Sequence, residues 1–199
     1  MATMRICFVG DSMVNGTGDP ECLGWTGRIC AAAMHDGHEI THYNLGIRRE
    51  TSGEIAARWH GEVRRRLPDG IDGRVVFSFG LNDLTVEDGK PRVSRANSLG
   101  NLHAILDQAR RGYQVLMVGP PPMLDDDGHA MPVAQLSAQY AAVCHELGVP
   151  YLDVVADLER TGAFVREALS NDGAHPRAAG YAELAALVQQ WDAWQAWFR

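Results

Sequence analysis

Residues 4–12 read MRICFVGDS, an apolar run that ends at a glycine, an aspartate and a serine. A short apolar run that stops at a glycine is typical of a buried β-strand. Four later runs are similarly rich in apolar, β-branched and aromatic residues, and longer segments with apolar residues at helical spacing separate them. Strands are therefore predicted over residues 4–9, 39–45, 74–79, 114–118 and 149–154.

The segments between the predicted strands carry helix signals. Thr51 or Ser52 can cap a helix that Pro68 and Gly70 end. Five alternations of strand and helix predict an α/β fold, with a parallel sheet and helices on both faces. Functional groups of such sheets gather on the loops beyond the carboxyl ends of the strands. Helices are predicted over residues 25–35, 51–67, 93–111 and 133–147, over 157–169 as one or two short helices, and from 176 to the end of the chain.

The composition is that of a soluble globular protein, and one domain over residues 1–199 is expected. The chain has 18 Lys and Arg against 25 Asp and Glu, a formal net charge of −7. An acidic chain whose longest basic cluster is Arg64–Arg66 is a poor nucleic-acid binder. The apolar runs fall short of the ~20 residues that span a bilayer, so no stable membrane insertion is expected. The N-terminal residues hold no signal-peptide pattern, which predicts a cytoplasmic protein.

The sequence shows no motif for a cofactor or a metal. The patterns G-x-G-x-x-G, the Walker A lysine loop and G-x-S-x-G do not occur. The four cysteines form no C-x-x-C pair and are expected to be buried thiols. They are Cys7, Cys22, Cys30 and Cys144. We therefore expect a protein that needs no cofactor.

Ser12 follows the first predicted strand directly, at the edge of the sheet where functional groups gather. A serine there can project its hydroxyl as a nucleophile, provided that a base lies within hydrogen-bond reach. On its own, Gly10-Asp11-Ser12 is weak evidence and favours an ordinary turn whose glycine and aspartate serve the backbone.

The last loop, Asp172-Gly-Ala-His175-Pro176, can supply that base. Asp172 stands three residues before His175, close enough to accept a hydrogen bond from the imidazole and fix its tautomer. Serine, histidine and aspartate in these roles form a catalytic triad. The alternative is an ordinary helix start, with Asp172 as cap and Pro176 in the first turn.

Two middle loops can stabilise the oxyanion of an acyl-transfer reaction. Gly46 ends the second predicted strand and Asn82 follows the third. The backbone N–H groups of Ser12 and Gly46 and the side-chain amide of Asn82 could converge on one oxygen. Taken singly, each of these turns is ordinary.

Four blocks occur in one order: Gly10-Asp11-Ser12, Gly46, Gly80-x-Asn82-Asp83 and Asp172-x-x-His175. In this arrangement the chain resembles the SGNH hydrolases, the GDSL esterase/lipase superfamily, over nearly its whole length. The resemblance implies a flavodoxin-like, three-layer α/β/α sandwich with a five-stranded parallel sheet. It also implies that Ser12 is the nucleophile, His175 the base and Asp172 its partner. Ser12, Gly46 and Asn82 would form the oxyanion hole.

The chain departs from the family pattern at two places. Met13 stands where the family name has leucine, a change that conserves volume. Arg49 stands where many relatives have a small residue, which brings Arg48 and Arg49 near the expected site. Our hypothesis is that one of them contacts an acidic or polar group of the substrate. The alternative is a pair of solvated arginines that bind Glu50 or Glu54.

Other residues are expected around the substrate. Asp11 adjoins the nucleophile, and Met123 lies with Leu124 and Met131 in the proline-rich segment 120–132, which could wall the pocket. The C-terminal helix is crowded with aromatic residues, which either pack on the sheet or form a surface for a homo-oligomer. Those residues are Trp191, Trp194, Trp197 and Phe198.

The whole pattern predicts a serine esterase that acts on a small-molecule ester through an acyl-enzyme, with short acyl groups, above all acetyl, favoured by the resemblance. Three alternatives use the same fold. The site could serve a lysophospholipase or acyl-thioesterase, or an acyltransferase whose acceptor is not water. The chain could also be a catalytically silent binding protein.

Overall fold

The computed structural model describes residues 4–124 and 132–199 of the chain. Its main sheet has five parallel strands in the order β2-β1-β3-β6-β7, as the alternation of elements predicted. The last strand is shorter than the predicted 149–154. The strands are β1 (Met4–Gly10), β2 (Ile40–Gly46), β3 (Gly73–Ser78), β6 (Gln114–Val118) and β7 (Tyr151–Leu152).

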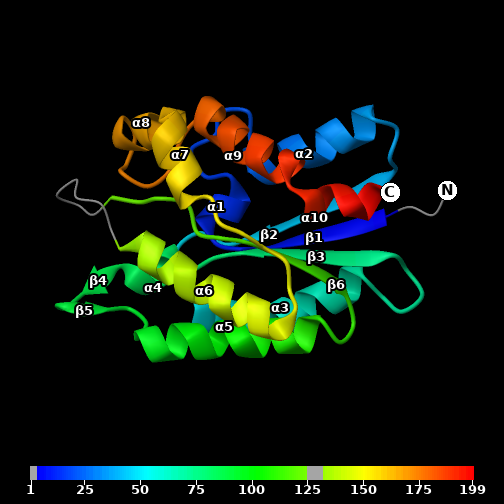
Figure 1. Cartoon of the computed structure of the whole chain (residues 1–199), viewed down its shortest axis with the longest axis horizontal. Helices are drawn as coiled ribbons and strands as arrows, with labels where there is room; N and C mark the ends of the chain where they lie inside the picture. The colour runs from blue at the N-terminus through cyan, green and yellow to red at the C-terminus, as the bar shows by residue number, and fades with distance from the viewer. Residues whose placement is uncertain (1–3, 125–131) are drawn as a thin grey trace.

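Helices cover both faces of this sheet and complete a three-layer α/β/α sandwich (Figure 1). The predicted short helices over 157–169 are two, separated by Gly162 with φ of +78°. One face carries α2 (Gly24–His35), α7 (Val155–Thr161), α8 (Ala163–Leu169) and α9 (Ala178–Gln190), and the other carries α3 (Ser52–Arg66), α5 (Arg95–Ala109) and α6 (Val133–Leu147).

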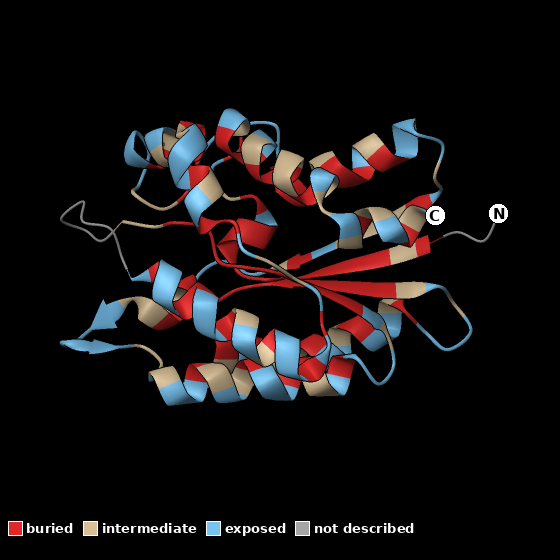
Figure 2. Ribbon diagram, viewed as in Figure 1, coloured by how far each residue is buried: buried red, intermediate tan, exposed pale blue. Residues whose placement is uncertain are grey.

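Side chains of β1 alternate between two hydrophobic cores, because successive residues of a strand point to opposite faces. Ile6 and Phe8 belong to the core under α2 and α9, whereas Cys7 and Val9 belong to the core under α3, α5 and α6. Figure 2 shows the strands buried between the two helical layers. Both faces of the sheet are thereby covered, and the loops of the site extend from its carboxyl edge.

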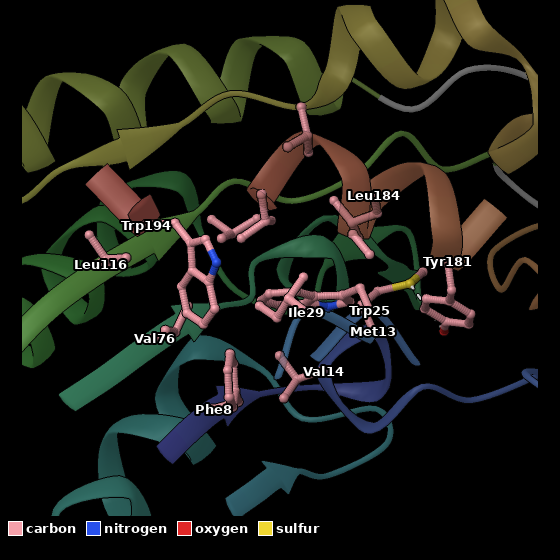
Figure 3. Packing of buried hydrophobic residues seen from close by; sticks show 14 of the residues in the cluster. Phe8, Met13, Val14, Trp25, Ile29, Val76, Leu116, Tyr181, Leu184 and Trp194 are labelled. Atoms are coloured by element: carbon pink, nitrogen blue, oxygen red, sulfur yellow. Dashed lines mark hydrogen bonds between the residues drawn. The ribbon is translucent and has the colours of Figure 1, made fainter. Parts of the chain in front are cut away.

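The C-terminal segment is not the single helix that the sequence suggested. The chain leaves α9 at Trp191, which adopts an extended backbone, and continues as α10 (Asp192–Gln195) and the 3₁₀ turn η1 (Ala196–Phe198). The break turns Trp194 into the core, where its ring lies 6.4 Å from that of Phe8 (Figure 3). Trp197 is buried as well. The interpretation as packing therefore holds for these two tryptophans, and self-association through this segment stays a prediction.

Short elements that the sequence pattern did not reveal surround the carboxyl edge of the sheet. They are α1 (Ser12–Asn15), α4 (Leu81–Leu84) and a hairpin of β4 (Val86–Glu87) and β5 (Lys90–Pro91). The prediction of four buried thiols is wrong for Cys22, which lies exposed in the loop before α2; the other three are buried. Within residues 4–124 and 132–199, no helix is long and apolar enough to cross a membrane.

Candidate active site

The nucleophile turn begins where β1 ends, and Gly10 permits its tight path. A Cβ at Gly10 would lie 1.9 Å from the carbonyl oxygen of Ser78 and 2.5 Å from a methyl group of Val14. No side chain fits in that space. Gly10 thus lets the chain turn directly from the strand into α1, whose first residue is Ser12.

Asp11 caps this turn. Its Oδ1 accepts a hydrogen bond from the N–H of Met13 at 2.9 Å, in the manner of a helix N-cap. The backbone N–H of Ser12 donates to none of the described residues, so it remains available to a ligand. Tyr181 stabilises the segment that follows α1, because its hydroxyl donates a hydrogen bond to the carbonyl oxygen of Thr17 at 2.8 Å.

His175 meets Ser12 across the carboxyl edge of the sheet. Its Nε2 lies 2.7 Å from Ser12 Oγ, and its Nδ1 lies 2.7 Å from Asp172 Oδ2. Both distances are those of good hydrogen bonds. The three residues that the sequence predicted as a triad are therefore brought together in relay geometry.

A compact turn holds Asp172 and His175 in register. Asp172 Oδ1 accepts from the N–H of Ala174 at 3.2 Å and from the N–H of His175 at 2.8 Å. Gly173 between them has φ of +81°, a conformation that suits glycine. One carboxylate oxygen thus fixes the turn, which leaves the other free to orient the imidazole.

The protonation of the relay follows from these contacts. Partial burial opposes ionisation of Asp172, but the hydrogen bonds from the His175 N–H and imidazole outweigh it and hold the pKa of the carboxyl below its usual range. An ionised carboxylate only accepts hydrogen bonds, so Nδ1 carries the ring proton. In the neutral imidazole, the form that acts as a general base, this tautomer directs the lone pair of Nε2 at the hydroxyl of Ser12.

Asn82 lies in α4, beside the nucleophile turn. Its Nδ2 donates to the carbonyl oxygen of Glu50 at 2.9 Å and contacts Asp11 Oδ2 at 3.3 Å. The structure therefore brings Asn82 next to the nucleophile turn, as predicted for an oxyanion donor. These two acceptors engage both hydrogens of the amide, so Asn82 must give up one contact to donate to an oxyanion.

Gly46 occupies the predicted loop, but its donor is already engaged. Its N–H donates to Asn44 Oδ1 at 3.0 Å. A Cβ at Gly46 would lie 2.2 Å from the backbone nitrogen of Asn15, so glycine is needed there for close packing against α1. The N–H groups of Arg48 and Arg49, farther along the loop, donate to none of the described residues.

The two arginines of this loop differ in their surroundings. Arg48 is 60% exposed, and its Nη2 lies 3.7 Å from Asp172 Oδ2, at the margin of the triad. Arg49 binds Glu87 of the hairpin at 3.2 Å. Glu50 and Glu54, the partners that a purely solvated pair would take, bind Arg58 and Arg92 instead.

Buried carboxyl groups lie behind the nucleophile. Asp11 is 1% exposed, so its carboxylate faces the protein interior. Burial raises the pKa of Asp11 to about 7, although the bond from Met13 lowers it; the charges of Asp83 and Glu50 raise it further. Asp83 is equally buried, with one oxygen bound to the N–H of Ser52 and the other unpartnered.

Met123 lines a small cavity beside the triad loop. The cavity measures about 160 Å³ and its wall includes Gly173, the neighbour of Asp172. Leu124 also borders it and donates its N–H to the carbonyl oxygen of Gly173 at 3.4 Å. Met131, the third predicted lining residue, lies outside the described residues. Most of the remaining wall is apolar: Pro122, Val165 and Ala168, with Glu159 as the charged member.

Sequence reasoning missed Arg58, a residue of α3 whose side chain connects that helix to β1 and β2. Its Nη2 donates to the carbonyl oxygens of Gly10 at 3.0 Å and Leu45 at 2.9 Å, and its Nε binds Glu50 at 2.6 Å. Arg58 thereby satisfies carbonyl groups near the ends of β1 and β2. Its position three residues after the buried Ile55 was a readable signal that it lies toward the sheet.

Residues 4–124 and 132–199 bring together no group of three or more His, Cys, Asp or Glu side chains suited to a metal ion.

Solved structures of two other proteins share the fold of this chain. The lipase/acylhydrolase from Enterococcus faecalis is 22% identical, with a TM-score of 0.79 and 94% of each chain covered. Axe2, an acetylxylan esterase from Geobacillus stearothermophilus, is 18% identical, with a TM-score of 0.77 and 96% of each chain covered. Both structures share the α/β fold of this chain, so the fold implied by the sequence is confirmed.

Sequence comparison gives the family. None of the curated protein sequences compared with the chain matches it significantly. The model of the GDSL-like Lipase/Acylhydrolase family matches residues 8–183, which include all four blocks. The chain is therefore a carboxylic ester hydrolase and belongs to the GDSL-like lipase/acylhydrolase family.

Proposed function

We propose that the protein is a serine esterase that cleaves esters of short acyl groups, acetyl above all, through a covalent acyl-enzyme. One observation carries the proposal: the continuous relay from Asp172 through His175 to Ser12, with both contacts at 2.7 Å. A serine hydroxyl is a weak nucleophile at its own pKa, and this relay supplies the base that activates it.

In the first half-reaction, Ser12 Oγ attacks the ester carbonyl carbon while its proton passes to His175 Nε2. The tetrahedral intermediate carries a negative oxygen, and the imidazolium is stabilised by Asp172. As the intermediate collapses, the bond to the alcohol oxygen breaks and Nε2 returns the proton to that oxygen. The alcohol leaves, and the acyl group stays on Ser12.

The second half-reaction repeats these steps with water. His175 takes a proton from a water molecule, whose oxygen attacks the acyl carbon. The new intermediate collapses with the electron pair returning to Ser12 Oγ, which regains its proton from Nε2. The carboxylic acid is released and the enzyme is restored.

The negative oxygen needs preorganised donors, each typically worth about 3–4 kcal/mol of barrier. The N–H of Ser12, which donates to none of the described residues, has the best support, and the amide of Asn82 can donate once it gives up its 3.3 Å contact with Asp11. A third donor would come from the β2–α3 loop. The N–H of Gly46 can fill this role only when its hydrogen bond to Asn44 Oδ1 is broken. The other candidates are the backbone N–H groups of Arg48 and Arg49, which donate to none of the described residues.

The preference for a small acyl group is supported by a solved structure of similar fold. Axe2, whose fold this chain shares, is described as an acetylxylan esterase. Arg48, exposed at the margin of the triad, is placed to meet a polar or anionic group on the substrate.

The test is initial-rate hydrolysis of p-nitrophenyl esters from acetyl to long acyl chains. We expect kcat/KM to be highest for acetyl and to fall steeply as the chain lengthens. A maximum at long chains, or preference for a lysophospholipid or acyl-thioester, would replace the acetylesterase proposal. Ester formed from added alcohol or sugar would indicate an acyltransferase, and no turnover of any ester would indicate a binding protein.

A further inference from the structure

The peptide at Arg49 is held in a strained conformation. Arg49 has φ of +70°, in the left-handed region that side chains with a Cβ adopt only at an energetic cost. Such a conformation persists only where its surroundings enforce it. Contacts around Arg49 must therefore hold it in this conformation.

The strained peptide lies between two contacts with the active site. On one side, the guanidinium of Arg48 reaches Asp172 at 3.7 Å. On the other side, the carbonyl oxygen of Glu50 accepts from the amide of Asn82 at 2.9 Å. A change of conformation at Arg49 would displace both neighbours, and with them the side chains that border the triad.

Arg92 provides the contact that holds the peptide. It follows the β4–β5 hairpin, and its Nη1 donates to the carbonyl oxygen of Arg49 at 2.8 Å. Its backbone N–H donates to the carbonyl oxygen of Thr85 at 2.9 Å, which anchors Arg92 to the base of the hairpin.

Two carboxylates orient the guanidinium of Arg92. Its Nε lies 3.3 Å from Glu87 of the hairpin, and its Nη2 lies 3.7 Å from Glu54 at the start of α3. The side chain of Arg92 is only 17% exposed. Glu87 also binds the guanidinium of Arg49, so Arg49 is held at its carbonyl oxygen by Arg92 and at its side chain by Glu87 of the hairpin.

We propose that Arg92 is a positioning residue, which holds the peptide at Arg49 in its left-handed conformation and so keeps the β2–α3 loop in place beside the triad. The inference rests on the proposed hydrolase function and adds to it a role for the hairpin. Arg92 acts through the loop and touches none of the triad residues, so its loss affects turnover more than substrate binding.

The experiment compares Arg92→Gln in two backgrounds, the natural chain and the Arg49→Gly variant, with p-nitrophenyl acetate as substrate. In the natural chain we expect kcat to fall about tenfold, with KM changed less than about twofold. With glycine at position 49 we expect Arg92→Gln to lower kcat less than about threefold, because glycine adopts φ of +70° without strain.

Controls separate positioning from general stability. Arg110→Gln removes an arginine that pairs with Asp107 at the far end of α5, and it should leave kcat unchanged. Thermal unfolding is measured for every variant. If Arg92→Gln fails to fold, Arg92→Lys replaces it in the experiment. Lysine keeps the positive charge but lacks the planar set of guanidinium donors, so it should lower kcat less than the tenfold expected for glutamine.

An unchanged kcat for the folded Arg92 variant, or an equal loss in both backgrounds, overturns the inference while the esterase proposal stands. An inactive natural chain overturns the proposed function and the inference with it.

Discussion

His175 Nε2 lies 2.7 Å from Ser12 Oγ, although 163 residues separate them in the chain. The parallel sheet explains this meeting. Ser12 follows β1, an interior strand of the sheet, and His175 precedes α9, which packs on the same face as α2. The geometry of the relay is therefore a property of the whole fold, and local changes around it test how each part contributes.

Replacing Asp172 with asparagine should disable the relay while leaving the turn intact. Oδ1 of the asparagine can still accept from the N–H groups of Ala174 and His175, but its amide hydrogens would face the Nδ1–H of the imidazole. The equivalent change in a serine protease lowers kcat about 10⁴-fold, and we expect a loss of at least about 10²-fold here because this carboxylate is partly exposed. Steady-state kinetics checks it. Near-normal kcat with an unchanged Tm would show that His175 needs no carboxylate partner.

Arg48 should favour substrates that carry a negative charge. Its guanidinium is exposed beside Asp172, whereas that of Arg49 is bound to Glu87. We expect Arg48→Ala to lower kcat/KM several-fold for an ester with an anionic alcohol group, and to change it little for a neutral ester of the same size. Equal kcat/KM values for both esters in the natural chain and in the variant would refute the role.

Asp11 should make the protein less stable as the pH rises from about 4 to about 7. Burial raises the pKa of this carboxyl to about 7, so the folded state binds its proton more tightly than the unfolded state does. The stabilising contribution is complete below the unfolded pKa near 3.8 and is lost as the pH rises through about 7.

The matched variant for this prediction is Asp11→Asn, which cannot ionise. Its free energy of unfolding relative to the natural chain should rise by a few kcal/mol between pH 5 and pH 8, since one pKa unit corresponds to about 1.4 kcal/mol. Urea unfolding at both pH values measures it. A difference that does not change with pH would mean that Asp11 is ionised throughout.

Arg58 should be important for stability. Removing its side chain leaves the carbonyl oxygens of Gly10 and Leu45 without this donor and Glu50 without its cation. Breaking a buried ion pair from one side typically costs about 3–5 kcal/mol, and because this pair is about 15% exposed we expect Arg58→Ala to cost about 2–4 kcal/mol. Arg64→Ala, an exposed arginine of the same helix, is the control and should cost less than about 0.5 kcal/mol. Similar unfolding free energies for the two variants would contradict this account.

The sequence pattern predicted the sheet and the triad because both depend on strong local signals. Gly10 after an apolar strand and Asp172 three residues before His175 are each constrained by neighbours in the chain. The break at Trp191 was missed, because aromatic residues at helical spacing continue beyond it. Burial of Trp194 against Phe8 depends on a strand at the other end of the chain.

The loop contacts of the site were beyond sequence reasoning for a similar reason. Gly46 was expected as a free donor, but whether its N–H is free depends on the rotamer of Asn44. The hairpin that precedes Arg92 is formed by strands of only two residues, too short for a periodic pattern. Pairing across 43 residues, as between Arg92 and Arg49, leaves no trace in local spacing.

The most direct test of the account is the rate of p-nitrophenyl acetate hydrolysis by the natural chain and by Ser12→Ala, measured in parallel on folded protein. Removal of a triad nucleophile costs up to about 10⁶-fold in kcat, and we predict a loss of at least about 10³-fold, with the Tm nearly unchanged because the substitution removes only a hydroxyl group. Ester hydrolysis that survives in Ser12→Ala at a comparable rate would contradict the assignment of Ser12 as the nucleophile.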